Sequence, residues 1–255
     1  MWEITREVGE RLVDALAPSA GETILELAAG PGDTGFLAAQ RLGPGGRLIS
    51  TDLVPEMVEA ARARAAELGL ENAEFRVADA QRLDLPSESV DAVLCRWGYM
   101  LLPDPAAGLA ETSRVLRPGG RLAFAVWAEA DRNPWGAVAG RALIRLGLLE
   151  PPAPDAPGPF RLGDVARVRS LVAGAGFEEP VVEEVALTWR YPSFEDWWRV
   201  SSDLSSTLSS ALRRLSAAET ERLRATAAEL LAPYAGPEGL AVPGVCRTVL
   251  TRRPG

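Results

Sequence analysis

The sequence contains no histidine and no lysine, so all 27 of its basic residues are arginine. A Walker P-loop needs a lysine, and pyridoxal phosphate is held as a Schiff base on one. A Ser-His-Asp triad needs histidine, and so do most zinc sites. The two cysteines, Cys95 and Cys246, are too few for a four-cysteine site, and both lie in apolar runs typical of buried free thiols. The sequence therefore predicts no metal site and excludes much of the common acid–base chemistry.

Acidic residues outnumber basic ones by 35 to 27, so the formal net charge is −8 at pH 7. A surface that coats DNA or RNA would be basic, so we expect no nucleic-acid partner. No apolar run approaches the roughly 20 residues of a membrane span, and the first residues, M-W-E-I-T-R-E, lack a signal-peptide pattern. We expect a cytoplasmic protein, monomeric or homodimeric, without a membrane span.

The chain is organised around residues 23–35, which read T-I-L-E-L-A-A-G-P-G-D-T-G. The apolar residues at the start predict a buried strand, which breaks into a Gly-Pro-Gly turn and then a helix beginning at Asp33. Glycines let the backbone turn tightly with no Cβ between it and a ligand. The helix N-terminus directs unpaired N–H groups and a positive dipole end into the same space. This pattern predicts a site for a nucleotide-like small molecule.

Strands alternate with helices along the first half of the chain, which indicates βαβ units and a parallel sheet wound right-handedly. The expected strands are 23–27, 46–51, 73–78, 90–95, 122–127, 181–189 and 245–251, and the last could lie antiparallel to the preceding one. The expected helices are 2–17, 33–42, 55–69, 103–116, 132–149 and 163–174, with a mostly helical segment over 193–235 and a Pro-rich loop over 151–159. The turn L-R-P-G-G precedes the fifth strand.

We expect a single domain of 255 residues with a core over about 18–130, 163–190 and 242–252 and helical insertions over about 131–160 and 193–240. Aromatic residues gather in or beside the insertions: Trp135, Trp189, Tyr191, Phe194, Trp197 and Trp198. They either line an apolar ligand pocket beneath a helical lid or form the lid's own core. Trp197 and Trp198 are adjacent in a predicted helix, so they cannot both face the same core.

The glycine motif alone does not identify the nucleotide, because G-P-G-D-T-G satisfies G-x-G-x-x-G and would also suit an NAD-binding fold. Two acidic residues argue against an NAD-binding fold. Glu26 lies within the first strand, where a dinucleotide fold usually has an apolar residue. Asp79 follows the third strand, where its carboxylate is suitably placed to bind the exocyclic amine of a nucleotide base. A last strand that returns antiparallel is also unusual for a dehydrogenase.

With these features, the sequence resembles the class I S-adenosylmethionine-dependent methyltransferases, particularly the methyltransferase type 11-like branch similar to the ubiquinone/menaquinone-biosynthesis enzymes. The matching segments cover residues 20–127 in the expected order: I-L-E-L-A-A-G-P-G-D-T-G, S-T-D-L-V-P-E-M, F-R-V-A-D-A-Q-R-L-D-L-P, D-A-V-L-C-R-W-G-Y-M-L-L-P-D and E-T-S-R-V-L-R-P-G-G-R-L-A-F. The sequence departs from the family at Ala28, where glycine is usual, and in the long helical insertion before the last strand. The resemblance implies a Rossmann-like, doubly wound, seven-stranded, mostly parallel α/β sheet with an antiparallel last strand and a helical lid.

The resemblance also implies how each part of S-adenosylmethionine is bound. Glu26 and the turn containing Ala28, Gly30 and Gly32 would surround the methionine portion, and the backbone around Arg96 and Trp97 would face its ammonium and sulfonium. Asp52 would accept both ribose hydroxyls, and Leu53 and Met57 would pack on adenine. Asp79 would accept from the adenine amine, with the Ala80 N–H on a ring nitrogen. Alternatively, Asp52 or Asp79 caps the next turn, Glu26 is a structural carboxylate, and Met57 is core filler.

The activity that the resemblance implies is methyl transfer from S-adenosylmethionine to an O, N or C atom of a small-molecule acceptor, with S-adenosylhomocysteine as product. Positioning of the reactants, worth roughly 7–11 kcal/mol, suits a protein without histidine or lysine. Ligands lie outside the carboxyl ends of the strands, which places these residues near the acceptor: Arg96, Trp97, Tyr99, Trp127, Glu129, Asp131 and Asn133. Tyr99 and Glu129 are the base candidates, and either is alternatively a wall residue or exposed to solvent. A protein that binds the cofactor without transfer and an NAD(P)-dependent oxidoreductase stay open.

Overall fold

The computed structural model describes residues 2–43, 45–153 and 155–255, which divide into two compact units. The first comprises Met1–Ala128, Pro157–Val185 and Cys246–Gly255, and the second comprises Glu129–Ala156 and Ala186–Val245. These ranges overlap the predicted core and insertions, while the expectation of a single domain stays a prediction. No helix in the described ranges is both long and apolar enough to cross a membrane.

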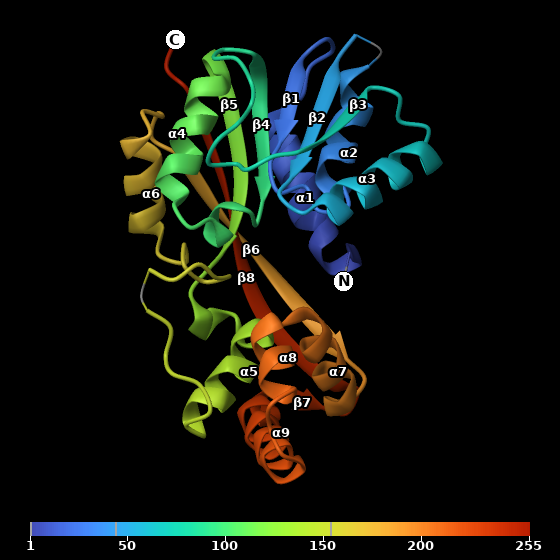
Figure 1. Cartoon of the computed structure of the whole chain (residues 1–255), viewed down its shortest axis with the longest axis vertical. Coiled ribbons are helices and arrows are strands. Elements are labelled where there is room, and N and C mark those ends of the chain that lie inside the picture. Colours follow the sequence, from blue (N-terminus) through green and yellow to red (C-terminus); the bar gives the residue numbers. More distant parts are fainter. Residues whose placement is uncertain (1, 44, 154) are drawn as a thin grey trace. The chain divides into compact units, whose positions relative to one another are not determined.

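One sheet with the strand order β3-β2-β1-β4-β5-β8-β6 forms the framework of the fold (Figure 1). Its strands are β1 (Thr23–Glu26), β2 (Arg47–Asp52), β3 (Ala73–Val77), β4 (Val90–Arg96), β5 (Leu116–Trp127), β6 (Val181–Tyr191) and β8 (Gly239–Arg252), and the short β7 (Ala235–Gly236) pairs with β8. The pairs from β3 to β5 are parallel, and β8 lies antiparallel to β5. The predicted mostly parallel sheet with an antiparallel last strand is confirmed.

The helices of the first unit cover the sheet because each has an apolar stripe. They are α1 (Trp2–Leu16), α2 (Asp33–Leu42), α3 (Pro55–Glu67), α4 (Pro105–Val115) and α6 (Val165–Gly174), with a 3₁₀ turn at Tyr99–Leu101. In α1 the residues Val8, Leu12 and Leu16 are fully buried, as their helical spacing predicts. Helix α1 packs against α2 and β5. Helix α4 packs against α6 (Figure 1).

Strand β5 begins earlier than the sequence pattern indicates. Its first residue, Leu116, pairs with Val90, but the next pair is Arg121 with Ala92, so the register shifts across the predicted L-R-P-G-G turn. Gly119 takes the left-handed conformation with a φ of +75°. The turn is therefore an irregularity within the strand, which a glycine at positive φ accommodates.

The second unit is mainly helical and uses its serines as helix caps. It contains α5 (Pro134–Arg145), α7 (Phe194–Leu204), α8 (Ser206–Leu212) and α9 (Ala217–Leu231), with 3₁₀ turns at Ala130–Arg132 and Ala232–Tyr234. Ser193, Ser205 and Ser216 each accept a hydrogen bond from a backbone N–H in the first turn of the following helix. Each cap satisfies a donor that the helix leaves unpaired. Helix α5 packs against α8 and α9.

The aromatic residues of the second unit form much of its own core. The rings of Trp135 and Trp189 stack with centroids 4.4 Å apart, and Trp197 is fully buried. Trp198 is half-buried, and the guanidinium of Arg224 lies 5.1 Å from its ring centroid. The two adjacent tryptophans of α7 therefore have different surroundings, as predicted, and the buried rings support the core interpretation over that of a pocket lining.

Replacing these two tryptophans separately tests that difference. Trp197→Ala leaves a cavity in the core and is expected to lower the free energy of unfolding by about 3–5 kcal/mol. Trp198→Ala removes a half-buried ring and one cation–π contact, so its loss should be about 1–2 kcal/mol. Urea unfolding followed by near-ultraviolet circular dichroism measures both values. Equal losses would contradict the assignment of Trp197 to the core.

Candidate functional site

The carboxyl ends of three neighbouring strands bring the predicted site residues to one edge of the sheet. Strand β1 ends at Glu26, β2 at Asp52 and β4 at Arg96, and Glu26 is in register with Ser50 and Leu94. The chain after β3 joins this edge through a 3.0 Å hydrogen bond from the N–H of Ala78 to the carbonyl of Asp52. In an open parallel sheet, this edge is where ligands bind.

The glycine turn between β1 and α2 is held in left-handed backbone conformations. Ala28, Gly30 and Gly32 have φ values of +50°, +55° and +89°. A Cβ on Gly32 would lie 2.3 Å from the Phe36 ring, so only glycine fits there. At Ala28, where the related family usually has glycine, the conformation costs roughly 1–2 kcal/mol. The N–H of Ala29 donates to the Thr51 carbonyl (2.9 Å), which ties the turn to β2.

Glu26 joins the first strand to the start of α2. Its buried carboxylate accepts from the N–H of Gly35 (2.7 Å) and the hydroxyl of Ser50 (3.2 Å). A Cβ on Gly35 would lie 2.1 Å from this carboxylate, so any other residue there would force the carboxylate to move. Burial raises the pKa of Glu26 to about 7, against the opposing effects of the Gly35 N–H, the Arg96 charge and Ser50. These contacts support the structural alternative for Glu26, and its ligand role stays a prediction.

Asp52 holds the glycine turn and also keeps room for a ligand. One carboxylate oxygen accepts from the N–H of Gly30 (2.8 Å), and the other from the N–H of Val54 (2.9 Å). Each carboxylate oxygen has about two acceptor positions, so each keeps one for another donor. Capping of the turn and binding of a vicinal diol are therefore compatible roles. Leu53 and Met57, which follow Asp52, are 64% and 42% exposed, so Met57 does not fill the core.

Asp79 forms a turn of its own beyond β3. Its side chain accepts from the backbone N–H of Gln81 (2.9 Å) and the Gln81 amide (3.2 Å), while its carbonyl accepts from the N–H of Arg82. This is the turn-capping geometry given above as the alternative. The carboxylate is half-buried, so contact with a ligand amine, together with the neighbouring Ala80 N–H, stays a prediction.

Two charged residues that sequence reasoning missed hold the turn from the side of α3. Arg64 donates to the carbonyl of Pro31 (2.9 Å) and to the carboxylate of Asp33 (2.6 Å). Asp33 is the first residue of α2, where a negative charge is favoured by the helix dipole. No local pattern indicates this pair, because the residues are 31 positions apart and α3 has a second arginine, Arg62, on its surface.

Arg96 and Trp97 form a stack at the end of β4. The guanidinium of Arg96 lies 4.7 Å from the Trp97 ring centroid, and the Trp97 ring stacks on Trp127 with centroids 4.5 Å apart. Trp97 is strained, with a φ of +63°, and its indole N–H donates to the Cys246 sulfur (3.3 Å). Backbone strain of this kind concentrates at functional sites.

The two base candidates have contrasting positions. Tyr99 is buried, its hydroxyl is 2.6 Å from that of Thr112, and burial raises its pKa well above the ordinary value. These facts favour a wall residue over a base. Glu129 is the first residue of the second unit, where its carbonyl accepts from the amide of buried Asn133. Asn133 also bonds the backbone of Val245 through both amide atoms, so its role there is structural.

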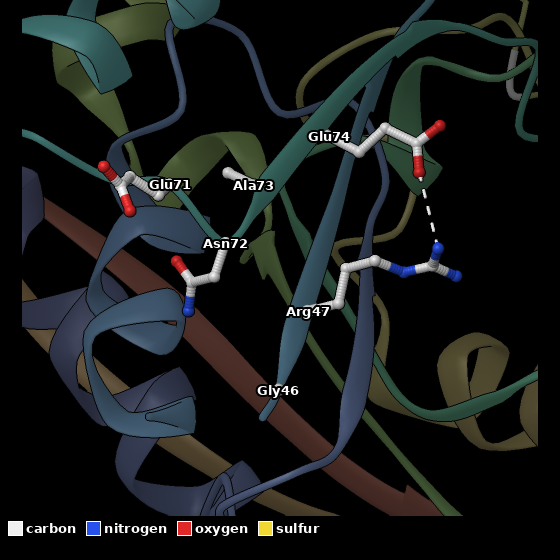
Figure 2. Close-up of a pocket in the computed structure, with 6 residues that line it drawn as sticks. All are labelled: Gly46, Arg47, Glu71, Asn72, Ala73 and Glu74. Carbon is white, nitrogen blue, oxygen red and sulfur yellow. Dashed lines mark ion pairs between the residues drawn. The ribbon is translucent and has the colours of Figure 1, made fainter. Parts of the chain in front are cut away.

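A hollow lies at the opposite ends of the strands. It is lined by Gly46, Arg47, Glu71, Asn72, Ala73 and Glu74, where β2 and β3 begin (Figure 2). Arg47 and Glu74 form an ion pair across it (3.7 Å), with both side chains well exposed. Ligands of open parallel sheets bind at the other edge, so this hollow is not the candidate site. The described residues hold no group of three or more acidic or cysteine side chains that suits a metal ion.

The raised pKa of Glu26 gives a testable pH dependence of stability. Between pH 4.5 and about 7 the folded protein binds a proton that the unfolded chain has released, so stability falls as pH rises through that window. The loss is about 3 kcal/mol, since one pKa unit corresponds to about 1.4 kcal/mol. Glu26→Gln keeps the hydrogen bonds without the charge, so it should match the wild type at pH 4.5 and exceed its stability at pH 8. Urea unfolding without ligand measures this, and parallel pH profiles for the two proteins would contradict it.

Comparison with known proteins agrees with this geometry. Residues 18–139 match a family described as a methyltransferase domain. Nocamycin O-methyltransferase of Saccharothrix syringae is 31% identical over 202 residues, which cover 76% of this chain and 72% of that protein. Demethylmenaquinone methyltransferase of Thermus thermophilus is 36% identical over 128 residues, covering 50% of this chain and 57% of that protein. Arsenite methyltransferase of Halobacterium salinarum is 44% identical over 110 residues, covering 43% of this chain and 28% of that protein.

The chain thus spans between about a quarter and three quarters of the lengths of these relatives. Among solved structures, a putative methyltransferase from Bacillus halodurans superposes with a TM-score of 0.68 at 19% identity, covering 98% of this chain and all of that one, which shows the shared fold. The long match to the Saccharothrix enzyme decides against a nicotinamide-dependent oxidoreductase. The chain belongs to the class I S-adenosylmethionine-dependent methyltransferases.

Proposed function

We propose that this protein transfers a methyl group from S-adenosylmethionine to a small-molecule acceptor. The observation that carries the proposal is the position of Asp52, whose carboxylate is fixed by the N–H groups of Gly30 and Val54 at the end of β2. A carboxylate held in this way, with one acceptor position left on each oxygen, suits the two hydroxyls of a ribose. The exposed apolar side chains of Leu53 and Met57 follow it and provide a surface for a flat base.

The remaining cofactor contacts follow from the same edge of the sheet. Glu26 and the turn from Ala28 to Gly32 surround the methionine portion, and the backbone at Arg96 and Trp97 faces its charged groups. Asp79 and the N–H of Ala80 lie beyond the adenine. When bound, the cofactor supplies a methyl group that its sulfonium already activates for displacement. The protein's own contribution is then to orient the two reactants and to exclude water.

The acceptor is a small molecule, because a protein with a net charge of −8 is poorly suited to bind nucleic acid. Without histidine or lysine, deprotonation of an acidic acceptor falls to a carboxylate or to bound water. Glu129 is the candidate that remains once Tyr99 is assigned to the wall. We expect the protein to act in the cytoplasm as a monomer or homodimer.

The burial of Tyr99 also favours a second candidate function. A protein that binds S-adenosylmethionine without transferring its methyl group needs no base, and Tyr99, one of the two base candidates, is buried with its pKa raised well above the ordinary value. Such a protein would serve as a partner or regulator. Turnover separates the two candidates, because both bind the cofactor.

Release of S-adenosylhomocysteine in the presence of a panel of small metabolites tests the transfer activity. Wild-type protein should release it with at least one acceptor, and Asp52→Ala should raise the KM for S-adenosylmethionine by more than about 100-fold, since it removes two hydrogen bonds to a charged group, each worth about 1.5–3 kcal/mol. Thermal melting must first show that the variant is folded.

Asp91→Ala is the matched control for Asp52→Ala. Asp91 also accepts from a backbone N–H of a neighbouring strand, that of Thr23 (2.8 Å), but lies at the amino end of β4. Its loss should lower stability while the KM for S-adenosylmethionine stays unchanged. A KM that is the same in Asp52→Ala and wild type would refute the proposed ribose contact. Cofactor binding without any release of S-adenosylhomocysteine would favour the second candidate.

A further inference from the structure

We propose that β3 is a self-association surface, on which a second copy of this chain adds its own β3 antiparallel and continues the sheet across a two-fold axis. The pairing is centred on Phe75, so each residue of the strand meets a defined residue of the partner. The inference is independent of the proposed activity, because it concerns the outer side of the sheet and not the ligand site. It assigns the homodimer as the oligomeric state.

The first observation is the direction of the backbone groups along β3. This strand ends the strand order, and among the described residues no other strand pairs with its outer side (Figure 1). On its inner side, the N–H of Leu48 in β2 donates to the carbonyl of Asn72 (2.9 Å). At the other end of the ladder, the N–H of Ala78 donates to the carbonyl of Asp52 (3.0 Å). The even-numbered residues thus bond to β2, and the N–H and carbonyl groups of the odd-numbered ones face outward: Ala73, Phe75 and Val77.

Outward groups at every second residue suit an antiparallel neighbour. In an antiparallel ladder, opposed residues that exchange two hydrogen bonds alternate with opposed residues that exchange none. A two-fold axis at Phe75 sets Phe75 opposite its own copy and Ala73 opposite the partner's Val77, so residues with outward groups meet one another. The Phe75 carbonyl accepts a long bond from Arg62 of α3 (3.4 Å), but a carbonyl has two acceptor positions and keeps one for the partner.

The second observation is that the charges on β3 are self-complementary. Glu74 and Arg76 flank Phe75 on one face of the strand, and each side chain is 39% exposed. The two-fold axis places Glu74 opposite the partner's Arg76, and Arg76 opposite the partner's Glu74. These are the pairs without hydrogen bonds, in which opposed side chains come closest. Charges on edge strands commonly keep copies apart, whereas this order brings unlike charges together.

The charged side chains already form a row on the surface of one chain. One oxygen of Glu74 lies 2.5 Å from Nε of Arg76. The other oxygen lies 3.7 Å from Nη1 of Arg47, on the neighbouring strand β2 (Figure 2). The two-fold axis joins this row to its copy, so acids and arginines alternate across both chains. A network of this kind contributes more than an isolated exposed ion pair does.

The opposite face of β3 offers apolar side chains to the partner. Phe75 is half-buried and Val77 is 55% exposed. Across the axis, the two Phe75 rings become cross-strand neighbours, and Val77 lies opposite the partner's Ala73, which stabilises the pair of strands. The strand has only five residues, so the interface is small and we expect a dissociation constant on the order of 10–100 µM.

Sedimentation equilibrium of the full chain, over about 1 µM to 1 mM, tests the association itself. The mean mass should rise from that of one chain toward twice that value and should not continue beyond it, because a two-fold contact closes on itself. A chain that stays monomeric over the whole range would overturn the inference and leave this edge to a strand of a different protein.

Charge reversal tests the register. Glu74→Arg leaves two positive charges on this face and Arg76→Glu leaves two negative ones, so like charges meet at both cross-strand positions in either homodimer. Each variant should dimerise at least about 10-fold more weakly than wild type. An equimolar mixture of the two should dimerise within about threefold of wild type, because unlike charges then meet at both positions. Single variants that dimerise like wild type, or a mixture without recovery, would overturn the inference.

Arg11→Glu is the matched control for Arg76→Glu. It makes the same change in net charge, and Arg11 also belongs to an exposed ion pair, with Glu7 of α1 (2.8 Å). This control should dimerise as wild type does. An equal loss in both variants would show a general effect of net charge and overturn the inference.

Hydrogen exchange tests the backbone pairing without any substitution. At concentrations where the chain is dimeric, the outward N–H groups of Ala73, Phe75 and Val77 should exchange at least about 10-fold more slowly than in dilute protein. The N–H of Ala78, which is bonded to β2, is the internal reference and should exchange at the same rate in both samples. Equal rates for the three outward groups in both samples would overturn the inference.

Discussion

The hydrogen bond from the Gly35 N–H to the buried carboxylate of Glu26 fixes the start of α2 against the end of β1. Everything else at this edge of the sheet depends on it, because the glycine turn spans the short distance between those two elements. The contact is so close that a side chain at position 35 would force the carboxylate to move. It is also costly, since burial disfavours the charged form of the carboxylate and raises its pKa to about 7. The buried carboxylate therefore lowers the stability of the fold at the site where a cationic ligand is proposed to bind.

Carboxylates attach the glycine turn on two sides, and each does so through backbone N–H groups. Glu26 holds its far end at Gly35, and Asp52 holds its middle at Gly30. Arg64 and Asp33 add a third attachment from α3. The backbone strain at Ala28 and Trp97 is maintained by these surrounding contacts. A preorganised turn of this kind reduces the entropy lost when a small ligand binds.

The sequence was sufficient to predict the order of the strands and helices and the residues at the strand ends. A hydrophobic run such as that of β4 can be recognised within a short stretch of sequence. Asp52 is predictable in the same way, because it lies at the end of the run of β2. The pairing of Asp33 with Arg64 was not predictable, because it depends on how α2 and α3 pack. The sequence left Tyr99 open between a base, a wall residue and an exposed residue, because its partner Thr112 lies on α4 and the packing of that helix is not a local feature. In the second unit, helix geometry alone predicted that the adjacent tryptophans Trp197 and Trp198 have different surroundings. It did not predict the stack of Trp135 on Trp189.

A crystal structure of the protein with S-adenosylhomocysteine tests the central claim most directly. The account predicts that both ribose hydroxyls lie within hydrogen-bonding distance of the Asp52 carboxylate, with the adenine against Leu53 and Met57 and the homocysteine portion beside the glycine turn. Density for the ligand at another place, such as the hollow between Arg47 and Glu74, with the Asp52 carboxylate left unchanged, would contradict it.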